Sequence, residues 1–87
     1  MASGKATKIE IERVQTGVRL EKRLLKVLKG LAEYLDLTLG DLLEGIALHA
    51  IDGKEPFTAA TRKRATELAK IYGLTLDSRN SHRLKEK

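Results

Sequence analysis

The side chains best suited to recognising another molecule lie in the segment from Val14 to Leu20. The even-numbered residues of this segment are apolar or small, and the odd-numbered residues between them are Gln15, Gly17 and Arg19. Alternation with a period of two predicts a β-strand with one buried face. A lone strand leaves backbone N–H and C=O groups without partners, so we expect it to pair with the same strand of a second copy. A two-stranded ribbon of this kind fits the major groove of DNA.

Two amphipathic helices are predicted directly after this strand. The first covers residues 21–35, where leucines recur at helical spacing and lysines occupy the opposite side. The second covers residues 39–51 and begins after Thr38, a favourable N-cap, and Gly53 follows its end. Its apolar face is wider than one neighbouring helix can cover, which favours burial in a homodimer.

A third helix is predicted over residues 59–72, and Gly73 is placed to end it. This helix carries the basic triplet Arg62, Lys63 and Arg64. The triplet is suited to contact phosphates that flank a DNA site, and a solvated helix face is the plain alternative.

The charge of the chain is concentrated at its two ends. The 87 residues carry 17 Lys+Arg and 12 Asp+Glu, for a net charge of +5. Residues 1–23 hold six basic and three acidic groups, and residues 58–87 hold eight and three, whereas residues 24–57 hold three and six. This distribution suits a polyanionic partner, and ordinary surface charge is the alternative.

The residue types also exclude several classes of protein. The absence of cysteine rules out a disulfide framework, a zinc ribbon and a thiol nucleophile. His49 and His82 have no neighbouring ligands at metal-binding spacing, and no catalytic triad or glycine-rich phosphate loop is present. We therefore expect no enzyme, no metal and no cofactor. No run approaches the ~18 apolar residues of a membrane span, so we expect a cytoplasmic, nucleoid-associated protein without membrane contact.

The order of strand, basic amphipathic helix, threonine-capped turn and apolar helix resembles the ribbon-helix-helix (Arc/MetJ-type) family of DNA-binding proteins. The likeness is carried by TGVRL (16–20), LLKVLKGLAEYLDL (24–37) and TLGDLLEGIAL (38–48). It implies a mostly α fold with one strand and two helices per chain in an intertwined dimer, here with a C-terminal third helix added. The expected division is a basic flexible arm (1–13), a ribbon-helix-helix unit (14–53) and a C-terminal helix with a basic tail (54–87).

The resemblance places Gln15, Gly17 and Arg19 against base edges in the major groove. Arg19 is able to donate two hydrogen bonds to guanine, and Gln15 is able to pair with adenine. Gly17 departs from the family pattern because it has no side chain to read a base. The plain alternative for Gln15 and Arg19 is an ordinary solvated strand face.

The resemblance also implies that Thr38, Leu39 and Gly40, at the start of the second helix, hold a DNA phosphate. Free backbone N–H groups and the helix dipole favour an anion there independently of any likeness. Simple capping of the helix by the same residues is the alternative.

Together these features predict sequence-specific binding of double-stranded DNA by a homodimer that acts as a transcriptional repressor. The alternative is an antitoxin or another protein–protein module, in which residues 54–87 bind a partner protein and DNA contact is secondary.

Overall fold

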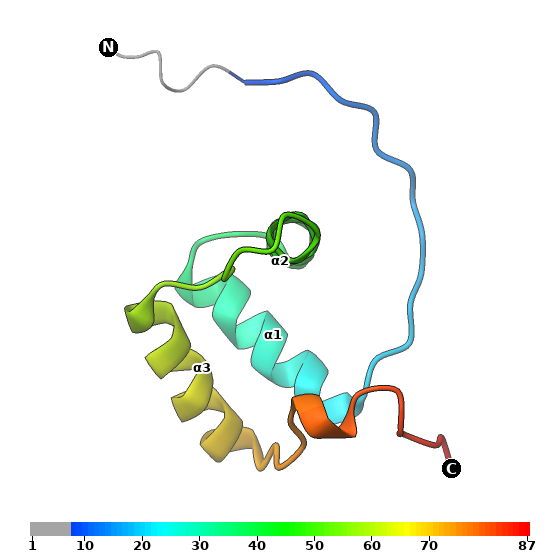
Figure 1. Cartoon of the computed structure of the whole chain (residues 1–87), viewed down its shortest axis with the longest axis vertical. Helices are drawn as coiled ribbons and strands as arrows, with labels where there is room; N and C mark the ends of the chain where they lie inside the picture. The colour runs from blue at the N-terminus through cyan, green and yellow to red at the C-terminus, as the bar shows by residue number, and fades with distance from the viewer. Residues whose placement is uncertain (1–7) are drawn as a thin grey trace.

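A computed structural model describes residues 8–87 of the chain. In these residues it contains helices α1 (Lys22–Tyr34), α2 (Leu39–Ile51) and α3 (Ala59–Tyr72), followed by the short 3-10 turn η2 (Ser78–Asn80) (Figure 1). The three helices predicted from the sequence are confirmed. The predicted flexible arm of residues 1–13 lies partly outside the described residues, because residues 1–7 are not among them.

Residues 14–20 do not form the predicted β-strand, and no strand occurs within residues 8–87. The ribbon-helix-helix fold class predicted from the sequence is therefore wrong, because that fold requires a strand. The segment instead runs as an extended arm that sweeps away from the helices (Figure 1). A strand is completed by hydrogen bonds to a neighbouring extended segment, and the described part of the chain supplies no such neighbour.

Each long helix begins at a side-chain cap that the local sequence supplies. The Thr38 hydroxyl accepts a hydrogen bond from the Asp41 N–H at 3.1 Å, and Thr58 caps α3 in the same way. At α1 the Glu21 carboxylate accepts the Leu24 N–H at 2.8 Å, and this bond lowers the pKa of Glu21. These caps satisfy N–H groups that have no acceptor within the helix, so the helix starts follow from local sequence.

A residue in the left-handed backbone conformation lies at the end of α3 and just after the last residues of α1 and α2. Gly53 follows α2 with φ of 70°, and Gly73 ends α3 with φ of 71°. After Gly73, the Leu74 N–H donates to the Ala69 carbonyl at 2.8 Å, which closes the last turn. Asp36, with φ of 60°, makes the corresponding turn between α1 and α2.

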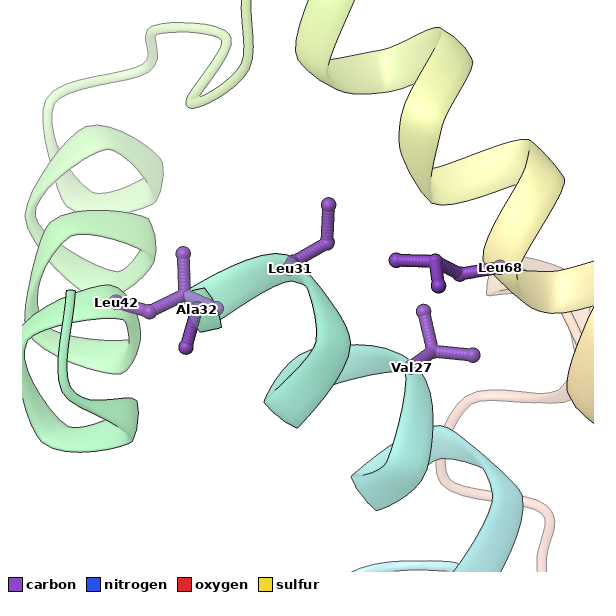
Figure 2. Packing of buried hydrophobic residues seen from close by; sticks show 5 residues of the cluster. All are labelled: Val27, Leu31, Ala32, Leu42 and Leu68. Atoms are coloured by element: carbon purple, nitrogen blue, oxygen red, sulfur yellow. The ribbon is translucent and has the colours of Figure 1, made fainter. Parts of the chain in front are cut away.

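The core is built around α1, which packs against both other helices. Val27, Leu31 and Ala32 of α1 are buried, and they meet Leu42 from α2 and Leu68 from α3 (Figure 2). Leu31 is the most enclosed of these side chains, with 1% of its surface exposed. Because α1 supplies three of the five residues of this cluster, it is the helix against which α2 and α3 are placed.

Helices α1 and α3 lie side by side and antiparallel (Figure 1). Near the start of α1, the Arg23 guanidinium donates to the Gly73 carbonyl at 3.5 Å. Near its end, the Arg64 guanidinium lies 5.5 Å from the centre of the Tyr34 ring. These two contacts hold opposite ends of the pair in register.

The approach of α3 to α1 depends on Gly30. A Cβ at this position would lie 3.1 Å from one methyl carbon of Leu68 and 3.2 Å from the other. Leu68 is itself buried, so its side chain has little space into which it can move. Gly45 in α2 offers a contrast, because a Cβ there would meet nothing within 4 Å.

We expect Gly45→Ala to stabilise the fold by about 1 kcal/mol, the difference in helix propensity between alanine and glycine. Gly30→Ala should give a smaller gain or a loss, because the new methyl group presses on Leu68. Urea unfolding of the two variants measures this difference. In a Leu68→Ala background the deficit at Gly30 should disappear, and an equal gain at both glycines in the parent chain would contradict the packing.

Candidate nucleic-acid interface

The predicted base-contacting residues lie in the extended segment of residues 8–20, which is called the arm from here on. Every side chain from residue 8 to residue 20 is exposed, including Gln15 and Arg19. Gly17 has open space around it, because a Cβ added there would meet no atom within 4 Å. The Arg19 guanidinium forms an ion pair with Glu86 near the C-terminus, and both side chains are largely exposed. An exposed pair of this kind contributes little to stability, so it leaves Arg19 available to another anion.

Arg13 ties the middle of the arm to α2. Its guanidinium donates to both carboxylate oxygens of Glu44, at 2.9 Å and 2.8 Å, and lies 3.6 Å from Asp41. The hydrogen bonds from Arg13 lower the pKa of Glu44, and the same bonds raise the pKa of Arg13. This contact joins the arm to the helical body at α2.

The start of α2 has the features of a helix N-terminus that is open to an anion. Thr38 is engaged as the cap, while the N–H groups of Leu39 and Gly40 belong to the first turn, which has no acceptor within the helix. Gly40 is exposed and Leu39 is half-buried. Asp41 places a carboxylate in the same turn, which opposes anion binding, although Arg13 lies beside that carboxylate.

The basic triplet of α3 does not form a single cationic surface. Arg62 pairs with Glu55 at 2.9 Å, and Arg64 pairs with Glu67 at 3.3 Å. Lys63 is exposed and takes part in none of the ion pairs found among residues 8–87. Successive residues on a helix point about 100° apart, so these three side chains point in different directions and meet different neighbours.

The predicted sites are not brought together in one chain. The arm curves along one side of the helical body, while α3 begins on the opposite side (Figure 1). Base contacts from the arm and phosphate contacts from Arg62 to Arg64 therefore belong to separate surfaces of the chain.

A cationic face on α1 was missed by the sequence interpretation, which treated it as the solvated side of the helix. Lys22, Lys26 and Lys29 are all exposed and follow the spacing i, i+4, i+7, which places them on one face. That spacing was the available signal. It became informative only when the opposite side of α1 proved to be covered by both α2 and α3.

Comparisons with known proteins returned no family model, no curated protein and no solved structure that matches this chain. Within the described residues, none of the helices has the length and apolar character needed to cross a membrane.

We expect Glu44 to titrate below the ordinary range of a glutamate, because its carboxylate accepts two hydrogen bonds from Arg13. A group whose pKa is lowered by folding stabilises the fold above its unfolded pKa, and this contribution is lost as the pH falls through the lowered value. The tether of the arm should therefore weaken in acid. Carbon-13 NMR titration of the side-chain carboxyls measures the pKa directly.

In Arg13→Gln the pKa of Glu44 should return towards its ordinary value. Asp77 provides an internal control, because its pKa is lowered by Arg79 and should stay lowered in the same variant. A Glu44 pKa that is unchanged by Arg13→Gln would show that the arm does not rest on α2.

Proposed function

We propose that this chain binds double-stranded DNA sequence-specifically as a homodimer and acts as a transcriptional repressor. The observation that carries the proposal is the exposed extended arm of residues 8–20 beside a helical body. Extended arms attached to helical DNA-binding domains reach into a groove of the duplex, and we assign this arm to the major groove, where the base edges are distinguishable. A β-ribbon has no part in this proposal, because residues 8–87 contain no strand.

Gln15 and Arg19 are the residues that would read the sequence. Arginine pairs with guanine through two hydrogen bonds, and glutamine pairs with adenine. Gly17 lies between them and has no side chain, which lets the arm backbone approach the DNA closely. Glu86 would be displaced from Arg19 on binding, at small cost because the pair is exposed.

Phosphate contacts would add affinity without adding sequence preference. The N–H groups at the start of α2 lie at the positive end of the helix dipole. Both the N–H groups and the dipole would stabilise a phosphate there. On α3, Lys63 is ready for such a contact, whereas its two neighbours would exchange a carboxylate for a phosphate. The residues assigned to phosphate beside the arm are Thr38, Leu39 and Gly40. Contacts from Arg62, Lys63 and Arg64 would have to reach a different stretch of DNA, because α3 begins on the side of the chain away from the arm.

The exposed end of α2 supports assembly into a homodimer. This helix sends only Leu42 into the buried cluster, while Leu48 is 67% exposed and Ile51 is 85% exposed. Ala47 and Ala50, on the same two turns, are exposed as well. A second copy that covers this end would remove apolar surface from water at about 25 cal/mol per Å². A two-fold dimer would also present two arms to a palindromic DNA site.

The packing of α3 does not favour the antitoxin alternative. That function requires residues 54–87 to fold on a partner protein, whereas Leu68 of α3 is buried against Val27 and Leu31 of the same chain.

We expect Arg19→Ala to weaken binding to the preferred DNA site by about 1–3 kcal/mol, because a two-bond contact to one base pair is lost. The preferred site is first obtained by selection from a random DNA pool, and affinity is then measured by fluorescence anisotropy. Binding to random DNA should change little. Lys70→Ala serves as the control, because it removes one exposed charge from α3 and leaves the arm and its partner Glu86 unchanged. Equal losses on preferred and random DNA would show that Arg19 does not read bases.

We expect the unfolding midpoint to rise with protein concentration, because dissociation accompanies unfolding of a dimer. Leu48→Asp combined with Ile51→Asp should yield monomers in analytical ultracentrifugation. Ile71→Asp is the matched control, since Ile71 is an exposed apolar residue on α3 with 67% of its surface accessible. A parent chain that is folded and monomeric at micromolar concentration would refute the dimer.

A further inference from the structure

The outer face of α1 carries positive charges that form no ion pair within the described residues. Residues 22–29 contain Lys22, Arg23, Lys26 and Lys29 and no acidic residue. None of these four takes part in an ion pair within residues 8–87, whereas Arg13, Arg19, Arg62, Arg64 and Arg79 each face a carboxylate. Arg23 turns towards the end of α3, which leaves the three lysines as the exposed face.

The position of these charges works against the stability of the helix. The first turn of α1 holds Lys22 and Arg23 and no acidic residue, although the N-terminal end of a helix dipole is positive. Glu21, which caps the helix, offsets only part of this repulsion. Cations that disfavour their own helix indicate a use outside the fold, and the dipole adds to the positive potential that an anion would meet.

The spacing of the three lysines suits a polyanion with regularly placed charges. From Lys22 to Lys29 the helix rises about 10.5 Å, at about 1.5 Å per residue. One strand of B-DNA presents a phosphate about every 3.4 Å along the axis. Because the strand also winds around the axis, its successive phosphates lie farther apart than this rise, so the face reaches up to three of them, one for each lysine. It also begins where the arm ends, since Arg19 lies only three residues before Lys22.

Contacts with α3 shape one edge of this face. The Lys26 ammonium lies 5.9 Å from the centre of the Tyr72 ring, which restrains the lysine towards α3. Lys26, Lys29 and Tyr72 line a shallow hollow together with Gly30 and Glu33. Glu33 places a carboxylate at the far end, so the anion-binding part runs from Lys22 to Lys29.

We propose that Lys22, Lys26 and Lys29 bind the sugar-phosphate backbone of the DNA that the arm reads. This inference rests on the proposed function and adds a third contact surface to it. An anionic membrane is the less favoured partner, because surface helices bind membranes through an apolar face. The apolar side of α1 is occupied by α2 and α3 instead.

The test compares two triple variants of the full chain. Lys22→Gln, Lys26→Gln and Lys29→Gln together remove the face, and Lys70→Gln, Lys85→Gln and Lys87→Gln together remove the same charge from other exposed positions. Affinity for preferred and random duplexes is measured by fluorescence anisotropy over a series of KCl concentrations. The α1 triple should flatten the slope of log K against log salt by about 2.7, at about 0.9 per lost phosphate contact, and weaken both duplexes alike.

Stability separates a loss of contact from a loss of fold. Urea unfolding of the α1 triple should stay close to the parent, because removal of Lys22 from the first turn favours the helix, whereas loss of the contact between Lys26 and Tyr72 opposes it. A triple of Lys→Arg changes at the same positions should keep the parent slope, which provides a second readout if the glutamine variant is unstable.

The outcomes distinguish the two proposals. If the parent shows no salt-dependent DNA binding, the proposed function falls and this inference falls with it. If the parent binds DNA and the α1 triple has the same slope as the control triple, only the α1 surface is refuted. If the α1 triple keeps DNA binding but loses binding to vesicles of phosphatidylserine and phosphatidylcholine, the partner of this face is a membrane and the inference is likewise refuted.

Discussion

The close packing of α1 between its two neighbours is the constraint on which the rest of the structure depends. Val27 and Leu68 point towards each other on one side of α1, and Ala32 lies beside Leu42 on another (Figure 2). Gly30 makes the approach of α3 possible, since a side chain there would meet Leu68. With two sides of the helix buried, one face of α1 remains in contact with water. The lysines of α1 occupy that face, so the hydrophobic packing determines where these three charges meet the solvent.

The arginines and lysines of this chain are used in different ways. Most arginines of the described residues face a carboxylate, and the contacts of Arg13 and Arg64 also position the arm and α3. An exposed ion pair contributes little free energy, because water already solvates both charges. Such pairs can open to accept a phosphate at small cost. The α1 lysines need no such exchange, and this makes their face better suited to the first encounter with a polyanion.

Helix α2 contacts the body through Leu42, which is buried, and through Ile46, which packs against the same cluster. Leu42 is its buried residue, whereas its last turns expose leucine, isoleucine and alanine. A helix that is apolar over so much of its surface is normally covered on more than one side. The exposed apolar end of α2 is the surface that the proposed homodimer would cover. In the proposed dimer, α2 supplies the assembly surface, while the arm and α1 supply the contacts to DNA.

The sequence by itself determined the three helices, because their starts and ends depend on residues only a few positions apart. Thr38 and Thr58 cap the nearest N–H groups, and Gly53 and Gly73 adopt backbone angles that other residues disfavour. The alternation of residues 14–20 predicted one buried face, but Val14 and Val18 are exposed along with Gln15 and Arg19, and the base-reading roles taken from the resemblance stay a prediction. The strand could not be decided in this way, since its hydrogen bonds come from another segment and the pattern of one segment does not supply them. Only the tertiary structure decided the roles of Gly30, the separation of Arg62, Lys63 and Arg64, and the free face of α1. Each of these depends on which helix lies against which, and distant parts of the chain settle that through packing.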